Sequence, residues 1–199
     1  MRVINLLGGP GAGKTTSAAG LFVQMKLQAL NCELVTEYAK DLTWEKRHAA
    51  LADQLYVLAK QNRRLERLRN QVDWIITDSP LILSLIYAPQ GYLGSYFHGL
   101  VMDLWGTYDN TCYFIDRVKE YSPIGRNQNE QDAKLIDEEI RILCFENNIH
   151  TKSIPGDWET PQRIMTNLGL VKKEETNGKS TTDGVSEIHP PKQIQSVAE

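Results

Sequence analysis

The sequence is poor in features that would assign it to a membrane or secreted class. It contains no apolar run of 18 residues, so no membrane-spanning helix is expected. Its first residues, MRVINLLGG, are interrupted by glycine too early for a signal peptide. The three cysteines, Cys32, Cys112 and Cys144, lack metal-ligand spacing and indicate buried thiols in a reducing compartment. We therefore expect a cytoplasmic protein without a membrane partner.

A large excess of charge of one sign is also missing. The chain has 199 residues, 24% of them charged, and a formal net charge of −3, so no global positive field points to nucleic acid, although a local basic face stays open. The length suits one domain. Residues 172–199 have almost no apolar content and cannot offset their ordering entropy. We predict one domain over residues 1–171 and a disordered tail over 172–199.

Short apolar stretches alternate with helical periodicity along this domain. Strands are predicted at residues 3–7, 33–37, 73–78, 112–116 and 150–154. Helices are predicted over 14–30, in one long stretch from about Thr43, over 133–145 and over 161–168. Because strands separated by helices form parallel sheets, we predict an α/β fold with a parallel five-stranded sheet and helices on both faces.

Glycine is concentrated in one place, the stretch GGPGAGKT at residues 8–15. It matches G-x-x-x-x-G-K-[ST] and lies between a predicted strand and a predicted helix, where the backbone N–H groups and the helix N-terminus attract phosphate. Lys14 is expected to reach the β- and γ-phosphates of ATP, and the Thr15 hydroxyl to coordinate Mg²⁺. The predicted ATP-binding residues are Gly8, Gly9, Pro10, Gly11, Ala12, Gly13, Lys14, Thr15 and Thr16.

Two carboxylates end the second and third predicted strands. Asp78 closes WIITD and is a candidate for the metal shell, and Glu37 closes ELVTE and is a candidate to accept a proton from a substrate hydroxyl. The carboxyl ends of parallel strands face the ligand crevice, which favours both roles. The alternatives are a turn role for Asp78 and a surface pair with Lys40 for Glu37. Which of the two carboxylates is the base stays open.

A charged segment, residues 116–133, joins the fourth strand to a helix. Arg117, Lys119 and Arg126 flank its proline and glycine. Such a segment is expected to close over the phosphates as a lid, with Arg117 and Arg126 stabilising the transferring charge. The alternative is a solvated charged loop.

Three further segments are candidates for substrate contact. The arginine-rich stretch QNRRLERLRNQ (61–71) is either a phosphate-backbone contact or a solvated helix face. Residues 87–99, rich in aromatics, glycine and proline, are interpreted as a substrate-covering insertion. Residues 155–157, PGD, are a weak candidate for adenine contact.

The order and spacing of four stretches carry a family resemblance: GGPGAGKT, VTEYAKDL, WIITDSP and RVKEYSPIGRNQNEQDA. Over about residues 1–168 the chain resembles P-loop kinases of the NadR-like AAA family, many of them bacteriophage proteins. The resemblance implies a three-layer P-loop NTPase of the nucleoside and nucleotide kinase type, with a lid, ATP and Mg²⁺. It gives Gly8 to Thr15 the ATP phosphates, Asp78 the metal or acceptor, Glu37 the acceptor, and Arg117 and Arg126 the lid.

The same resemblance implies phosphoryl transfer to a hydroxyl of a nucleoside-like acceptor. In such relatives the acceptors include nicotinamide riboside and, in phage, 5-hydroxymethyluridine within DNA. A phage-encoded enzyme of this kind would work in the host cytoplasm. The acidic net charge disfavours a DNA substrate without excluding it.

Two other classes of function compete with the kinase. One is an ATPase switch that drives a partner, which is disfavoured because the third strand ends in TDSP rather than in an Asp-Glu pair that would activate water. The other is a nucleotide-binding regulatory module without turnover. Acceptor-stimulated release of ADP distinguishes the three.

Overall fold

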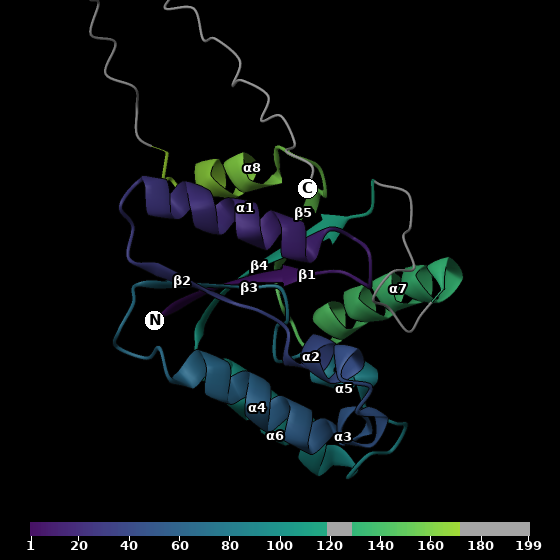
Figure 1. Ribbon diagram of the computed structural model, residues 1–199. Helices are drawn as coiled ribbons and strands as arrows, with labels where there is room; N and C mark the ends of the chain where they lie inside the picture. Colours follow the sequence, from purple (N-terminus) through teal and green to yellow (C-terminus); the bar gives the residue numbers. More distant parts are fainter. Residues whose placement is uncertain (119–128, 172–199) are drawn as a thin grey trace, which may run out of the picture.

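A five-stranded parallel sheet forms the centre of the molecule in the computed structural model, which describes residues 1–118 and 129–171 (Figure 1). The strand order is β2-β3-β1-β4-β5, and every neighbouring pair is parallel. The strands are β1 (Arg2–Leu7), β2 (Cys32–Val35), β3 (Trp74–Thr77), β4 (Asp109–Asp116) and β5 (Thr151–Pro155). The prediction of a five-stranded parallel sheet is confirmed.

Helices α1 (Lys14–Leu27) and α8 (Thr160–Asn167) cover one face of the sheet (Figure 1). Their buried side chains, among them Leu21 and Met165, pack on the apolar residues of the strands. The two helices approach closely, because a Cβ atom on Gly20 would lie 2.8 Å from Cγ of Pro161. Parallel strands need apolar cover on both sides, and these two helices supply it on one side.

Helices α4 (Gln54–Glu66), α6 (Ser95–Gly106) and α7 (Glu130–Glu146) cover the opposite face. Leu58, Val101 and Ile140 represent them in a core that also contains Ile75 and Phe114 of the sheet. Three short helices, α2 (Tyr38–Trp44), α3 (His48–Ala52) and α5 (Leu83–Tyr87), lie beyond the strand ends. The molecule therefore has the three layers of the predicted α/β fold.

The single long helix predicted from Thr43 is wrong. The chain forms α2, α3 and α4 there, because Lys46 adopts a positive φ of 56° and the Asp53 side chain caps α4 by accepting from the backbone N–H of Tyr56. Neither signal breaks the leucine periodicity from which the long helix was predicted.

The segment interpreted as an insertion, residues 87–99, ends inside a regular element. From Ser95 onward the chain belongs to α6, which buries Phe97, Val101 and Trp105 against the core. Residues 88–94, between α5 and α6, are irregular, with positive φ at Gly91, Leu93 and Gly94. Within residues 87–99 only Phe97 is buried, and the role of the segment in covering a substrate stays a prediction.

The strand register brings three chain segments to one edge of the sheet. Asn5 of β1 and Val35 of β2 both align with Thr77 of β3, so the segments that follow these strands emerge side by side. Residues 119–128 of the predicted lid segment 116–133, including Arg126, and the predicted tail 172–199 lie outside the described residues. No helix in residues 1–118 or 129–171 has both the length and the apolar character needed to span a membrane.

Candidate functional site

The glycine-rich loop connects β1 to α1 and presents its backbone at the sheet edge. Gly13 precedes α1 with a φ of 103°, a left-handed conformation that glycine adopts without strain. The Lys14 ammonium donates to the carbonyl oxygens of Gly8 (2.6 Å) and Gly9 (3.0 Å), which folds its side chain back across the loop. Burial lowers the pKa of Lys14, and the nearby carboxylates of Glu37 and Asp78 oppose that shift.

The Thr15 hydroxyl at the start of α1 meets the carboxylate that follows β3. Thr15 Oγ1 donates to Asp78 Oδ2 at 2.6 Å. Asp78 is only 2% exposed, and its other oxygen, Oδ1, is buried without a partner among the described residues. A buried anion with an unsatisfied oxygen is costly unless a cation or donor completes it. A hydroxyl and a carboxylate are the hard oxygen donors that Mg²⁺ takes, so the pair fits this metal.

Glu37 lies beyond the end of β2 rather than in it. The strand stops at Val35, and Glu37 is the N-cap residue of α2, with an extended backbone. Burial raises the pKa of Glu37, and Asp78 adds to the rise while Lys14 opposes it. The predicted alternative, a surface ion pair with Lys40, does not form among the described residues. The carboxylate therefore sits in a setting that moves its titration toward neutral pH.

A buried glutamine on α4 holds the turn that carries Glu37. Gln61 accepts from the backbone N–H of Tyr38 at 2.9 Å and donates to the carbonyl of Thr36 at 3.3 Å. These two residues flank Glu37 on either side, so one amide fixes both ends of its turn. The sequence offered no local signal for this role, because Gln61 looks like any polar residue on a helix.

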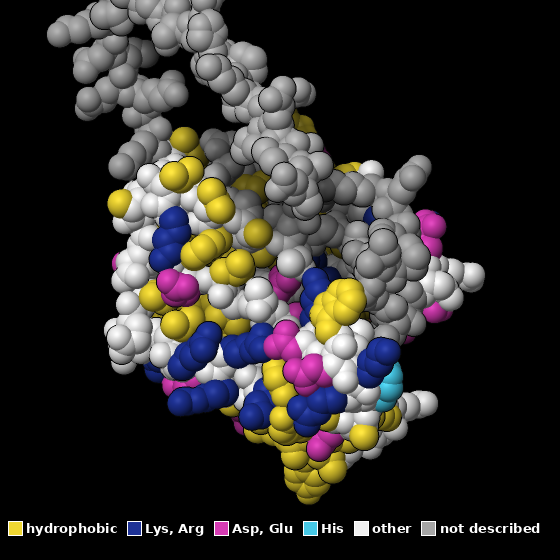
Figure 2. Space-filling view, viewed as in Figure 1, with side chains coloured by type: hydrophobic (Ala, Val, Ile, Leu, Met, Phe, Trp, Pro, Cys, Tyr) yellow, Lys and Arg dark blue, Asp and Glu magenta, His cyan; other side chains and the backbone are white. Residues whose placement is uncertain are grey.

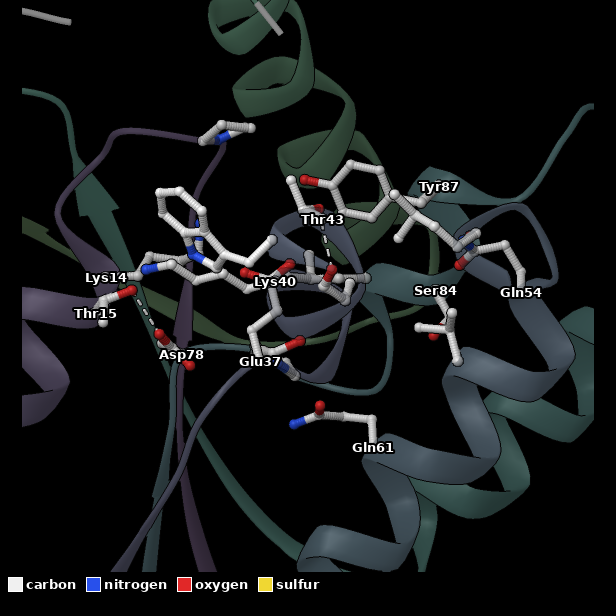
Figure 3. Close-up of a pocket in the computed structure, with 18 of the residues that line it drawn as sticks. Lys14, Thr15, Glu37, Lys40, Thr43, Gln54, Gln61, Asp78, Ser84 and Tyr87 are labelled. Atoms are coloured by element: carbon white, nitrogen blue, oxygen red, sulfur yellow. Dashed lines mark hydrogen bonds between the residues drawn. The ribbon is translucent and has the colours of Figure 1, made fainter. Parts of the chain in front are cut away.

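A cavity of about 670 Å³ joins these groups. Figure 3 shows Lys14, Thr15 and Asp78 at one end, Glu37 in the middle, and Gln54, Ser84 and Tyr87 toward the other end. The first end is built by the glycine-rich loop. Residues of α2, α3, α5 and the start of α4 also line the cavity, among them Trp44, His48, Leu51 and Val57.

Arg117 lies against the glycine-rich loop and not among the residues that line the cavity. Its guanidinium donates to the carbonyl of Pro10 at 2.9 Å and forms an ion pair with Asp137 of α7 at 2.9 Å. Asp137 was not a predicted site residue, because nothing in the sequence distinguishes it from the other acidic residues of its helix. Arg126 is outside the described residues.

The PGD segment also borders the glycine-rich loop. A Cβ atom on Gly156 would lie 2.4 Å from the carbonyl oxygen of Ala12, and the Gly156 carbonyl faces Gly13. Next to it, Trp158 is 83% exposed. The segment therefore packs on the loop, and its suggested contact with adenine stays a prediction.

The arginine-rich stretch, the last part of α4 and the residues after it, has both paired and exposed side chains. Arg64 forms an ion pair with Asp41 and donates to the Thr36 carbonyl, while Arg69 forms an ion pair with Glu66. Arg63 and Arg67 are exposed, as is Lys60 one turn earlier. Figure 2 shows Lys and Arg side chains gathered on this lower left part of the molecule, where α4 lies.

Comparison with known proteins identifies similar folds. A family profile described as AAA domain matches residues 3–160. A solved structure of deoxyadenosine kinase from M. mycoides with bound dATP has a TM-score of 0.57 and 19% identity, and the match covers 85% of this chain and 100% of that one. Thymidylate kinase from Ehrlichia chaffeensis has a TM-score of 0.55 and 16% identity, over 84% of this chain and 98% of that one. No curated protein matches in sequence. At these identities the structural likeness shows the fold.

Proposed function

The chain belongs to the AAA-domain family, and we propose that it is an ATP-dependent kinase that transfers the γ-phosphoryl group to a hydroxyl of a nucleoside-like acceptor. One observation carries the proposal. The glycine-rich loop, the Thr15–Asp78 pair and the partly buried Glu37 carboxylate share one cavity with a second end built by other elements. A site for ATP hydrolysis alone has no need of that second end.

The phosphate end of the cavity supplies charge and orientation. In the proposed mechanism Lys14 and the backbone N–H groups of residues 11–16 hold the triphosphate. Thr15 and Asp78 would hold Mg²⁺, which when bound neutralises charge on the β- and γ-phosphates. The buried, unpartnered Oδ1 of Asp78 supports this assignment.

Glu37 is the proposed base. Its carboxylate lies between the two ends of the cavity (Figure 3), whereas the Asp78 carboxylate already accepts from Thr15. A raised pKa brings a carboxylate nearer to the basicity that proton transfer at neutral pH requires. Glu37 would orient the acceptor hydroxyl and accept its proton as the phosphoryl group moves. Arg126 completes the proposal as the lid cation, whereas Arg117, predicted for the same role, contacts the glycine-rich loop from outside the cavity.

Two acceptors of this class are favoured by different observations. The cavity volume of about 670 Å³ falls within the range of small-molecule pockets and favours a free nucleoside, nicotinamide riboside included. The exposed Lys60 and Arg63 on α4, a helix that also lines the cavity, and Arg67 directly after it favour 5-hydroxymethyluridine within DNA, as expected for a phage kinase.

The experiment uses γ-labelled ATP with Mg²⁺ and compares 5-hydroxymethyluracil-containing duplex DNA with a panel of free nucleosides and nucleoside monophosphates. Label moving to DNA assigns the polymer-acting kinase, and label moving to a small molecule assigns the metabolite kinase. Lys14→Ala is the control and should abolish either transfer.

Release of ADP without any acceptor dependence would replace the kinase by an ATPase switch. ATP binding with neither transfer nor hydrolysis would replace it by a regulatory module.

A further inference from the structure

One carboxylate on α7 joins that helix to the glycine-rich loop. Asp137 Oδ1 accepts from the backbone N–H of Gly9, and Asp137 Oδ2 accepts from Nε and Nη2 of Arg117 at 3.2 and 2.9 Å. The same guanidinium donates from Nη1 to the carbonyl of Pro10 at 2.9 Å. The two side chains are only 11% and 14% exposed. Asp137 therefore reaches Gly9 directly and Pro10 through Arg117.

The fit between α7 and the loop is close. A Cβ atom on Gly9 would lie 2.5 Å from the carbonyl oxygen of Ala133 and 2.9 Å from Asp137 Oδ1, so only glycine leaves room for this contact. On the inner side of the loop, Lys14 holds the carbonyls of Gly8 and Gly9. The backbone of residues 8–10 is thus held from the cavity side by Lys14 and from the α7 side by the Asp137–Arg117 pair.

We propose that Asp137 is a positioning residue that sets the phosphate-binding conformation of the loop, and that Arg117 serves as the partner that makes its negative charge compatible with a bound triphosphate. A loop with four glycines loses much conformational freedom when it binds phosphate, so fixing its backbone beforehand favours binding. An unpaired carboxylate at the same place would repel the phosphates, and the guanidinium of Arg117 neutralises it.

This assignment differs from a direct role of Arg117 on the phosphates, and the two make opposite predictions for Asp137→Asn. If Arg117 contacts phosphate directly, removing its competing carboxylate frees the cation, and ATP affinity stays the same or increases. If Asp137 positions the loop, the same variant loses the ion pair that orders the loop, and affinity falls.

The test measures binding of a non-hydrolysable ATP analogue with Mg²⁺ to the full chain by calorimetry, so it needs no acceptor. We expect Asp137→Asn to weaken binding by roughly tenfold, about 1.4 kcal/mol. Arg117→Gln leaves the buried carboxylate unpaired, and we expect it to weaken binding more, by roughly thirtyfold. The double variant should recover to the level of Asp137→Asn, because removing the carboxylate removes the repulsion.

Asp116, the residue before Arg117, offers a matched control. Asp116 at the end of β4 forms an ion pair with Arg141 of α7 at 2.7 Å, one helical turn from Asp137, and the described residues in contact with its side chain do not include the loop. Asp116→Asn should change analogue affinity by less than about twofold, since it weakens the same helix-to-sheet attachment without touching residues 8–10.

Three results would overturn the inference: wild-type affinity in Asp137→Asn, a double variant no better than Arg117→Gln, or an equal loss in Asp116→Asn. Thermal melting of each variant checks folding, and Arg117→Lys, which keeps the charge, replaces Arg117→Gln if the latter does not fold. The inference rests on the proposed nucleotide binding. Failure of the wild-type chain to bind the analogue would remove the proposed function itself, whereas the outcomes above leave it standing.

Discussion

The hydroxyl of Thr15 lies 2.6 Å from the carboxylate of Asp78, although 63 residues separate them in the chain. The contact forms because β1 and β3 are neighbours and both lead to the same edge of the sheet. Of the two Asp78 oxygens, this contact satisfies only one.

Thr15→Ala and Thr15→Ser test the metal role of that pair. Thr15→Ala removes a hard oxygen donor, and we expect transfer to fall by more than about a hundredfold and the Mg²⁺ concentration for half-maximal rate to rise. Thr15→Ser keeps the hydroxyl and should retain most activity. A Mg²⁺ titration of the initial rate measures both, and equal Mg²⁺ dependence of the two variants would contradict the assignment.

Glu37→Gln tests the base. We expect turnover to fall by more than about tenfold with unchanged ATP-analogue affinity, because the amide cannot take the acceptor's proton. Burial raises the pKa of Glu37 above its ordinary value of 4.5, so the acid limb of the wild-type pH–rate profile should lie above that pH. The variant should lack that limb. Unchanged turnover would leave Asp78 as the base.

The same raised pKa has a consequence for stability. The folded chain holds the Glu37 proton more tightly than the unfolded chain, so the associated stability is fully present below the unfolded pKa and is lost as pH rises through the folded pKa. Relative to wild type, Glu37→Gln should therefore gain stability between pH 4 and pH 8. Denaturant melts at both pH values measure this change, and a pH-independent difference would argue against the raised pKa.

Gln61→Leu tests the turn that carries Glu37. The variant removes both side-chain contacts with the backbone of Thr36 and Tyr38, and leaving a buried backbone group unpaired costs about 1–3 kcal/mol. We expect turnover to fall by about tenfold while analogue affinity changes by less than about twofold. Asn62→Leu is the control: the neighbouring side chain contacts Tyr108 instead. Equal losses in both variants would mean a general effect on α4.

Gly156→Ala tests the packing of the β5–α8 turn on the loop. Its new Cβ atom would meet Ala12 O at 2.4 Å, Ile115 Cγ2 at 2.8 Å and Asp116 O at 2.9 Å. We expect a loss of about 1–3 kcal/mol in stability and weaker ATP-analogue binding, as overpacking displaces the loop. Gly99→Ala, in α6 with nothing within 4 Å of its new Cβ, should instead stabilise by about 0.5–1 kcal/mol. Urea melts compare the two.

Sequence patterns predicted the sheet and the glycine-rich loop between a strand and a helix because both signals are local. The apolar strands and the GGPGAGKT stretch can be read within a few residues, and the structure contains the predicted strands. The break at Lys46 was missed because a single left-handed residue without glycine leaves the leucine periodicity intact.

The supports of the site could not be predicted in the same way. Asp137 meets Gly9 across 128 residues and Gln61 meets the Thr36–Tyr38 turn across the space between α4 and α2, so each contact depends on helix placement that no short pattern encodes. For the same reason the sequence predicted a lid role for Arg117 but gave no sign that it pairs with Asp137.

The two ends of the cavity are attached to the fold differently, and this separation bears on how such a protein evolves. The phosphate end is anchored to the central strands β1 and β3. The other end is built largely from α2, α3 and α5, and α3 contributes no buried side chain at all. Changes there alter what enters the cavity without disturbing the strand ladder. Under the proposed function, acceptor choice can therefore diversify between relatives while the residues proposed to bind ATP stay the same.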